Sequence, residues 1–167
     1  NGIYNDNVDK FLNKPKIDLL IEETDNLQLK IKIRERAKHY KIPVLMVTGN
    51  GSGLIIDIER FDLDSNLQLL NGYLRENIIK KINELSAETS LLEKVNLARD
   101  FMGREFLTER LNESFDLIGK GLIGIPQLSE SSFLRGAVLS YFAREITLGK
   151  SIKSGRYLLQ LDSLNII

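Results

Sequence analysis

The sequence lacks several residue types on which common functional sites depend. Its 167 residues include no cysteine, no tryptophan and one histidine. The absence of cysteine excludes disulfides, Cys-ligated zinc, a thiolate nucleophile and a covalent thioester. One histidine cannot supply a His-rich metal site. No apolar run approaches the roughly 20 residues that a membrane-spanning helix needs.

Neither sign of charge is in excess. The chain carries 23 basic and 23 acidic side chains, for a formal net charge of zero. This balance removes the general electrostatic argument for nucleic acid or an anionic membrane as a partner. Apolar residues make up 43% of the chain, enough for a folded core. The chain begins at Asn1 without an initiating methionine or a signal peptide, so we expect a segment of a longer, cytoplasmic protein.

The pattern of apolar residues along the sequence changes near residue 68. Before it, three short apolar runs predict buried strands, at residues 17–21, 43–47 and 54–58. After it, apolar residues recur at helical spacing, and the tail at 155–161 is typical of a last strand. We therefore predict an α/β fold with a partial Rossmann-like parallel sheet over residues 1–68. A mostly helical extension over residues 69–167 follows, whose apolar faces serve as core or interface.

The stretch between the first two apolar runs decides how their strands are connected. Residues 27–33 alternate as in a strand, but Asp25 followed three residues later by Gln28 resembles a capping box. Residues 34–38 are rich in helix formers. We predict a helix here, which makes strand, helix and strand a right-handed crossover in a parallel sheet.

A family resemblance rests on three stretches between residues 17 and 58. They are Asp-Leu-Leu-Ile-Glu-Glu-Thr-Asp-Asn at 18–26, Lys-Ile-Pro-Val-Leu-Met at 41–46 and Gly-Leu-Ile-Ile-Asp at 53–57. Together they resemble the ThiF/MoeB superfamily, the adenylating enzymes that activate ubiquitin-like proteins. The Thr-Asp-Asn turn at the end of a strand is the most specific part of this resemblance.

The resemblance implies a nucleotide site at the end of the first strand. Asp25 would hold the magnesium of bound ATP, a cation that prefers hard oxygen ligands. Asn26 and Lys30 would contact the cofactor, and a ubiquitin-like protein or a small carboxylate would be the substrate. From the residues alone, Asp25 fits better as a helix N-cap, and Lys30 and Arg34 fit better as solvated charges. Glu22 and Glu23 also fit as solvated charges.

The chain departs from the family pattern at several points. The glycine-rich phosphate loop of the family, with its arginine and lysine, has no counterpart here, and Lys41 replaces a usual glycine. The chain therefore looks like the C-terminal part of an adenylating domain. We expect it to be inactive alone, with ATP and magnesium used by the intact protein to adenylate a carboxylate.

A non-catalytic role is the alternative. The degenerate α/β part would then be a platform and the helical part a homodimerisation or interaction module, in a protein that could also carry a nitroreductase-like flavin domain.

The other motifs in the sequence indicate no further activity. The glycines at 49, 51 and 53 lack the Lys-Ser or Lys-Thr of a phosphate loop and predict a flexible turn. Lys150, Lys153 and Arg156 fit a solvated basic loop, and His39 fits a helix end.

Overall fold

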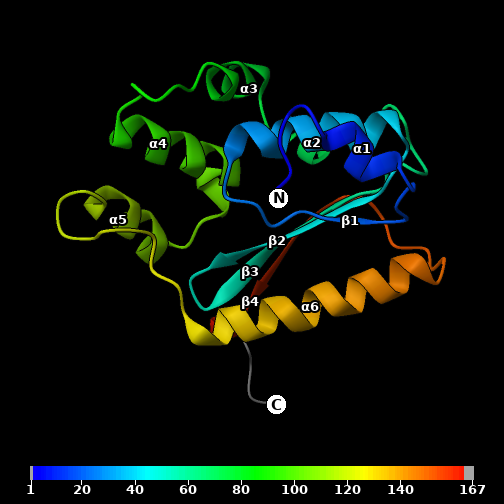
Figure 1. The fold of residues 1–167 in the computed structure, drawn as a ribbon. Helices are drawn as coiled ribbons and strands as arrows, with labels where there is room; N and C mark the ends of the chain where they lie inside the picture. The colour runs from blue at the N-terminus through cyan, green and yellow to red at the C-terminus, as the bar shows by residue number, and fades with distance from the viewer. Residues whose placement is uncertain (1, 164–167) are drawn as a thin grey trace, which may run out of the picture.

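The computed structural model describes residues 2–163 and shows a four-stranded sheet between helices (Figure 1). The strands run in the order β1–β2–β3–β4, with bounds Leu20–Ile21, Val44–Asn50, Gly53–Glu59 and Gly155–Gln160. The α/β class is confirmed. The β1–β2 pair is parallel, whereas β2–β3 and β3–β4 are antiparallel, so the sheet is mixed.

The turn between β2 and β3 explains why the parallel arrangement stops at one pair. Asn50 lies opposite Gly53, which leaves only Gly51 and Ser52 to connect the strands. Two residues can close an antiparallel hairpin, but a parallel pair needs a crossover of a dozen residues or more. Gly51 has a φ of 65°, a conformation that glycine adopts without strain.

Helices cover both faces of the sheet. Figure 1 shows the first two on one face and the last, longest helix on the other. The helices are α1 Val8–Asn13, α2 Leu27–His39, α3 Glu76–Asn83, α4 Leu91–Met102, α5 Glu109–Leu117 and α6 Ser129–Thr147. Leu45 and Val47 of β2 pack on the α6 side, while Val44 and Met46 pack on the α2 side. Because both faces are buried, β2 and β3 read as continuous apolar runs.

The N-terminus of α2 differs from the predicted capping box by one residue. The Asn26 side chain accepts a hydrogen bond from the Leu29 amide at 2.9 Å, so Asn26 is the N-cap. The side chain of Gln28 instead donates to the carbonyls of Asn83 and Leu85, at 3.2 and 3.0 Å. The capping role predicted for Asp25 is therefore wrong, and Gln28 links α2 to the end of α3.

Residues 69–167 contribute to the sheet as well as to the helices. They supply β4, which pairs with β3, and α6, which packs on β2 and β3. Arg156 of β4 contacts Asp57 of β3 twice, at 2.7 and 3.0 Å, and its guanidinium lies 5.1 Å from the ring centres of Tyr73 and Phe106. The solvated interpretation of Arg156 is wrong, because β4 turns this side chain into the protein.

No helix within residues 2–163 is long and apolar enough to cross a membrane.

Candidate functional site

A pocket of about 320 Å³ lies beyond the carboxyl end of β1. Its wall comes from the β1–α2 connection, the second half of β2, helix α4 and the segment around the start of α6. Met46, Phe101 and Ile125 make one part of the wall apolar. In open α/β sheets, ligands bind at this position, outside the carboxyl ends of parallel strands.

Two of the three residues expected at a nucleotide site line this pocket. Asp25 is exposed at its rim, and Lys30 lies one helical turn into α2. Asn26 lines an adjoining groove with Leu85 and Lys94, and its side-chain oxygen is engaged in capping α2. Within residues 2–163, no group of three or more His, Cys, Asp or Glu side chains could hold a metal. A magnesium ion at Asp25 would therefore take its other oxygen ligands from a bound phosphate and from water.

Glu22 is the centre of a buried hydrogen-bond network beneath the pocket. Its carboxylate accepts bonds from the amide and hydroxyl of Thr24, at 2.8 and 2.6 Å. It also contacts Lys30 Nζ at 3.1 Å and Arg34 Nη1 at 2.5 Å. Glu22 therefore fixes both the turn that leads to Asp25 and the lysine in the pocket wall.

Arg34 continues this network between α2 and the sheet. It is fully buried, and its Nε donates to Glu59 at 2.9 Å. Glu59 in turn accepts a bond from the Leu70 amide at 2.7 Å. The solvated interpretations of Glu22 and Arg34 are therefore wrong. The available signal was the spacing of Lys30 and Arg34, since residues four apart share one helix face.

Burial and charge together set the ionisation of this network. Burial alone would raise the pKa of Glu22, but the Arg34 and Lys30 charges outweigh it and lower that pKa below the ordinary 4.5. Burial lowers the pKa of the Lys30 amine, and the Glu22 charge opposes this only in part. Burial raises the pKa of Glu59 despite the contact with Arg34. The Glu22 carboxylate, which contacts Lys30 of the pocket wall, thus favours its charged form.

A second ion pair stands at the other side of the pocket. Glu23 accepts a hydrogen bond from the Val47 amide at 2.8 Å and lies 3.7 Å from Arg135 of α6. Burial raises the pKa of Glu23, and the Val47 bond and the Arg135 charge oppose this. Arg135 follows Asp25 by more than a hundred residues, so no local pattern in the sequence pointed to it.

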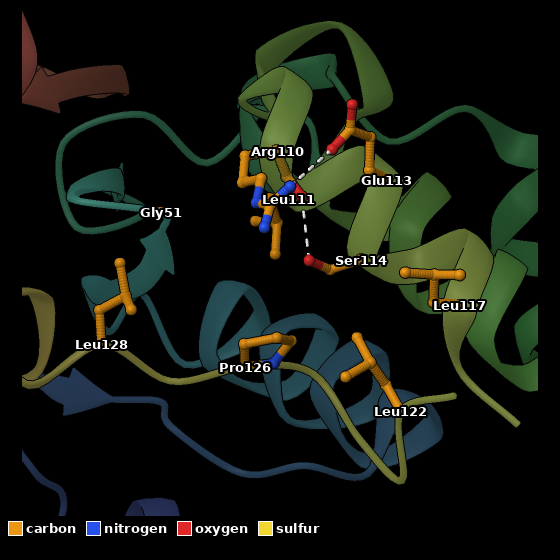
Figure 2. A pocket seen from close by; sticks show the side chains of 9 residues that line it. All are labelled: Gly51, Arg110, Leu111, Glu113, Ser114, Leu117, Leu122, Pro126 and Leu128. Carbon is orange, nitrogen blue, oxygen red and sulfur yellow. Dashed lines mark hydrogen bonds and ion pairs between the residues drawn. The ribbon is translucent and has the colours of Figure 1, made fainter. Parts of the chain in front are cut away.

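Another pocket, of about 350 Å³, lies between α5 and the segment before α6 (Figure 2). Leu111, Leu117 and Leu122 dominate its wall. Its polar groups are engaged with one another. Arg110 contacts Glu113 at 3.3 Å, and the Ser114 hydroxyl donates to the Arg110 carbonyl at 2.9 Å. The pocket at Asp25 is the better candidate site, because it combines charged groups with apolar walls at a strand end.

Comparisons with known proteins give one relative and no function. No known family model matches the chain, and no solved structure matches it. The chain is 29% identical over 155 residues to the uncharacterized protein MT1398 of Mycobacterium tuberculosis (strain CDC 1551 / Oshkosh). The match covers 93% of this chain but 21% of the relative, so the chain spans about a fifth of the relative's length. The similarity therefore includes both the sheet-forming and the helical parts.

Proposed function

We propose that this chain forms one wall of the nucleotide site of a larger, ThiF-like protein, which uses ATP and magnesium to adenylate a carboxylate. One observation carries the proposal. Asp25 and Lys30 line a pocket beyond the carboxyl end of β1 and beside the second half of β2, its parallel partner. This is where an open α/β sheet presents a ligand.

The residues of the pocket fit a metal–phosphate group better than a free anion. Lys30 already shares its charge with Glu22, and Arg135 lies beside Glu23, so neither cation is fully free to attract phosphate. The Asp25 carboxylate is exposed at the rim and suits a hard cation that phosphate oxygens also ligate. When bound, magnesium offsets phosphate charge as pyrophosphate leaves.

Each side chain then has a defined task in this proposal. Asp25 holds the cation, and Lys30, oriented by Glu22, presents a positive charge to the phosphates. Phe101 and Met46 exclude water from the inner wall, where their apolar surface can also contact a base. The glycine-rich loop and the second set of cations come from outside these residues.

Pyrophosphate release by the full-length protein tests the proposal. We expect Asp25→Ala to slow release at least about tenfold, because the cation loses a direct ligand. Asp18→Ala is the matched control, since Asp18 is also exposed but precedes β1 and lies outside the pocket. Equal rates for wild type and Asp25→Ala would remove Asp25 from the reaction.

An interaction module is the second candidate function. The observation that favours it is the group of exposed apolar side chains on α6, where Phe133 is 83% and Tyr141 48% exposed. A full-length protein that associates through α6 but releases no pyrophosphate would support this function alone.

A further inference from the structure

Helix α6 has an exposed stripe along the side that faces away from the sheet. Its inner side packs on β2 and β3 through residues such as Leu134, Val138 and Ile146. Figure 1 shows α6 as the outermost layer on that face. The opposite side is exposed and also carries small polar residues such as Ser132, Ser140 and Thr147. One line along it is here called the α6 stripe and contains Glu130, Phe133, Ala137, Tyr141, Arg144 and the C-cap Leu148. Spacings of three and four residues place these side chains along one line.

The α6 stripe carries three large apolar side chains that are exposed to solvent. Phe133, Tyr141 and Leu148 are 83%, 48% and 65% exposed, and they follow one another along the stripe. Single exposed apolar residues are common, but an aligned set indicates a surface that is covered by a partner.

The order of residues along the stripe identifies the partner. Phe133 lies four residues before Ala137 and Tyr141 four after it, while Glu130 lies seven before and Arg144 seven after. When two copies of α6 cross antiparallel at Ala137, residues equally far from the centre meet. Phe133 then faces Tyr141 of the other copy, and Glu130 faces Arg144. A two-fold interface requires this kind of self-complementarity.

The centre of the stripe permits a close crossing. Gly136, Ala137 and Ser140 are small and exposed, and a Cβ added at Gly136 would meet nothing within 4 Å. Small side chains allow two helices to approach to an axis separation of about 8 Å.

We infer that a second copy of this chain docks on the α6 stripe, as an antiparallel two-fold homodimer. The charged residues are free to reorient on docking. Arg144 contacts Glu145 at 3.3 Å and lies 5.5 Å from the centre of the Tyr141 ring, with its side chain 62% exposed. Glu130 contacts the neighbouring Ser129 at 3.3 Å. The inference does not depend on the nucleotide site, because Asp25 and Lys30 lie outside the stripe.

Charge reversal tests the pairing directly. We expect the dissociation constant, measured by sedimentation equilibrium, to rise about tenfold in Glu130→Arg and in Arg144→Glu, since each places like charges opposite one another. The double variant should recover the wild-type value, because both ion pairs re-form with reversed polarity. A chain that stays monomeric at every concentration, or a double variant as weak as the singles, would overturn the inference.

Cross-linking tests the position of the two-fold axis. The chain has no cysteine, so Ala137→Cys introduces the sole thiol, and dimerisation would bring the introduced thiols of two copies together at the crossing. We expect mild oxidation to convert the Ala137→Cys variant to a disulfide-linked dimer. Ala87→Cys is the matched control, at an exposed alanine between α3 and α4. Equal cross-linking of both variants, or none in Ala137→Cys, would contradict the proposed geometry.

Discussion

At the scale of single residues, the molecule is organised by buried charges that neutralise one another. The acids Glu22, Asp57 and Glu59 are each at most 1% exposed. Each contacts at least one buried or nearly buried cation, namely Lys30, Arg34 or Arg156. A buried charge without a partner destabilises the folded state by several kcal/mol. Removing one member of an ion pair therefore leaves the other as such an uncompensated charge. The network beneath the pocket is therefore sensitive to changes of charge rather than of volume.

Glu22→Gln should destabilise the protein by about 3–5 kcal/mol at pH 7, because it leaves Arg34 and Lys30 facing a neutral amide. The lowered pKa of Glu22 gives the sign of the pH dependence. Its ionisation stabilises the fold above the ordinary value of 4.5, and this contribution is lost as the pH falls through the folded-state pKa. The difference from wild type in urea unfolding should therefore shrink in acid.

Glu35→Gln is the matched control for this experiment. Glu35 is exposed on the same helix, and its change should alter the free energy of unfolding by less than about 0.5 kcal/mol. A difference between wild type and Glu22→Gln that stays constant from neutral to acid pH would show that the charge of Glu22 is not what stabilises the network.

At the scale of elements, the start of α2 places a residue that stabilises the helix next to a residue that lines the pocket. Asn26 caps the helix through the Leu29 amide, whereas Asp25 immediately before it is exposed at the pocket rim. A capping residue satisfies a backbone donor that the helix itself cannot reach. Substitutions at Asn26 and at Asp25 should therefore have different effects on the stability of the fold.

Asn26→Ala should lower the free energy of unfolding by about 1 kcal/mol, the usual loss for an N-cap. Asp25→Ala should leave it unchanged within about 0.5 kcal/mol, since the Asp25 carboxylate is exposed. Urea unfolding of the two variants measures both values. If Asp25→Ala were as destabilising as Asn26→Ala, Asp25 would have a structural role that the hydrogen bonds of α2 do not show.

Elements that depend on local pattern could be predicted from the sequence. Helix α2 and strands β2, β3 and β4 lie where the sequence pattern predicted them, and most residues between β3 and β4 that form regular structure are helical, as the helical spacing indicated. Of the run at 17–21, only Leu20 and Ile21 pair as a strand. Asp25 and Lys30 were candidates because the resemblance covers the contiguous stretch that contains the turn, and both line the pocket.

Features that depend on tertiary contacts could not be predicted in the same way. The burial of Arg34 depends on Glu59, which belongs to a strand 25 residues further along. Arg135 reaches the pocket only because α6 packs beneath the sheet. The antiparallel direction of β3 followed from the two residues of its turn, which the glycine spacing had indicated only as flexible.

At the scale of the whole molecule, the last strand, β4, forms one edge of the sheet and connects distant parts of the chain. β4 pairs with β3 along its length although the two strands are separated by nearly a hundred residues, and helices α3 to α6 lie between them in the chain. The contact of Arg156 with Asp57 spans 99 residues, and the same arginine donates to the Met102 carbonyl at 2.8 Å. This side chain thus joins the sheet, the end of α4 and the rings of Tyr73 and Phe106.

Arg156→Met should destabilise the whole molecule by about 3–5 kcal/mol, because Asp57 would remain buried without its cation. Arg156→Lys should lose less, since it keeps the charge but cannot make both contacts with the carboxylate. Asp57→Asn combined with Arg156→Met should recover part of the loss, because no buried charge then stays unpaired. Urea unfolding followed by circular dichroism gives the three values. An Arg156→Met variant with a wild-type midpoint would mean that the β3–β4 pairing holds the sheet without this ion pair.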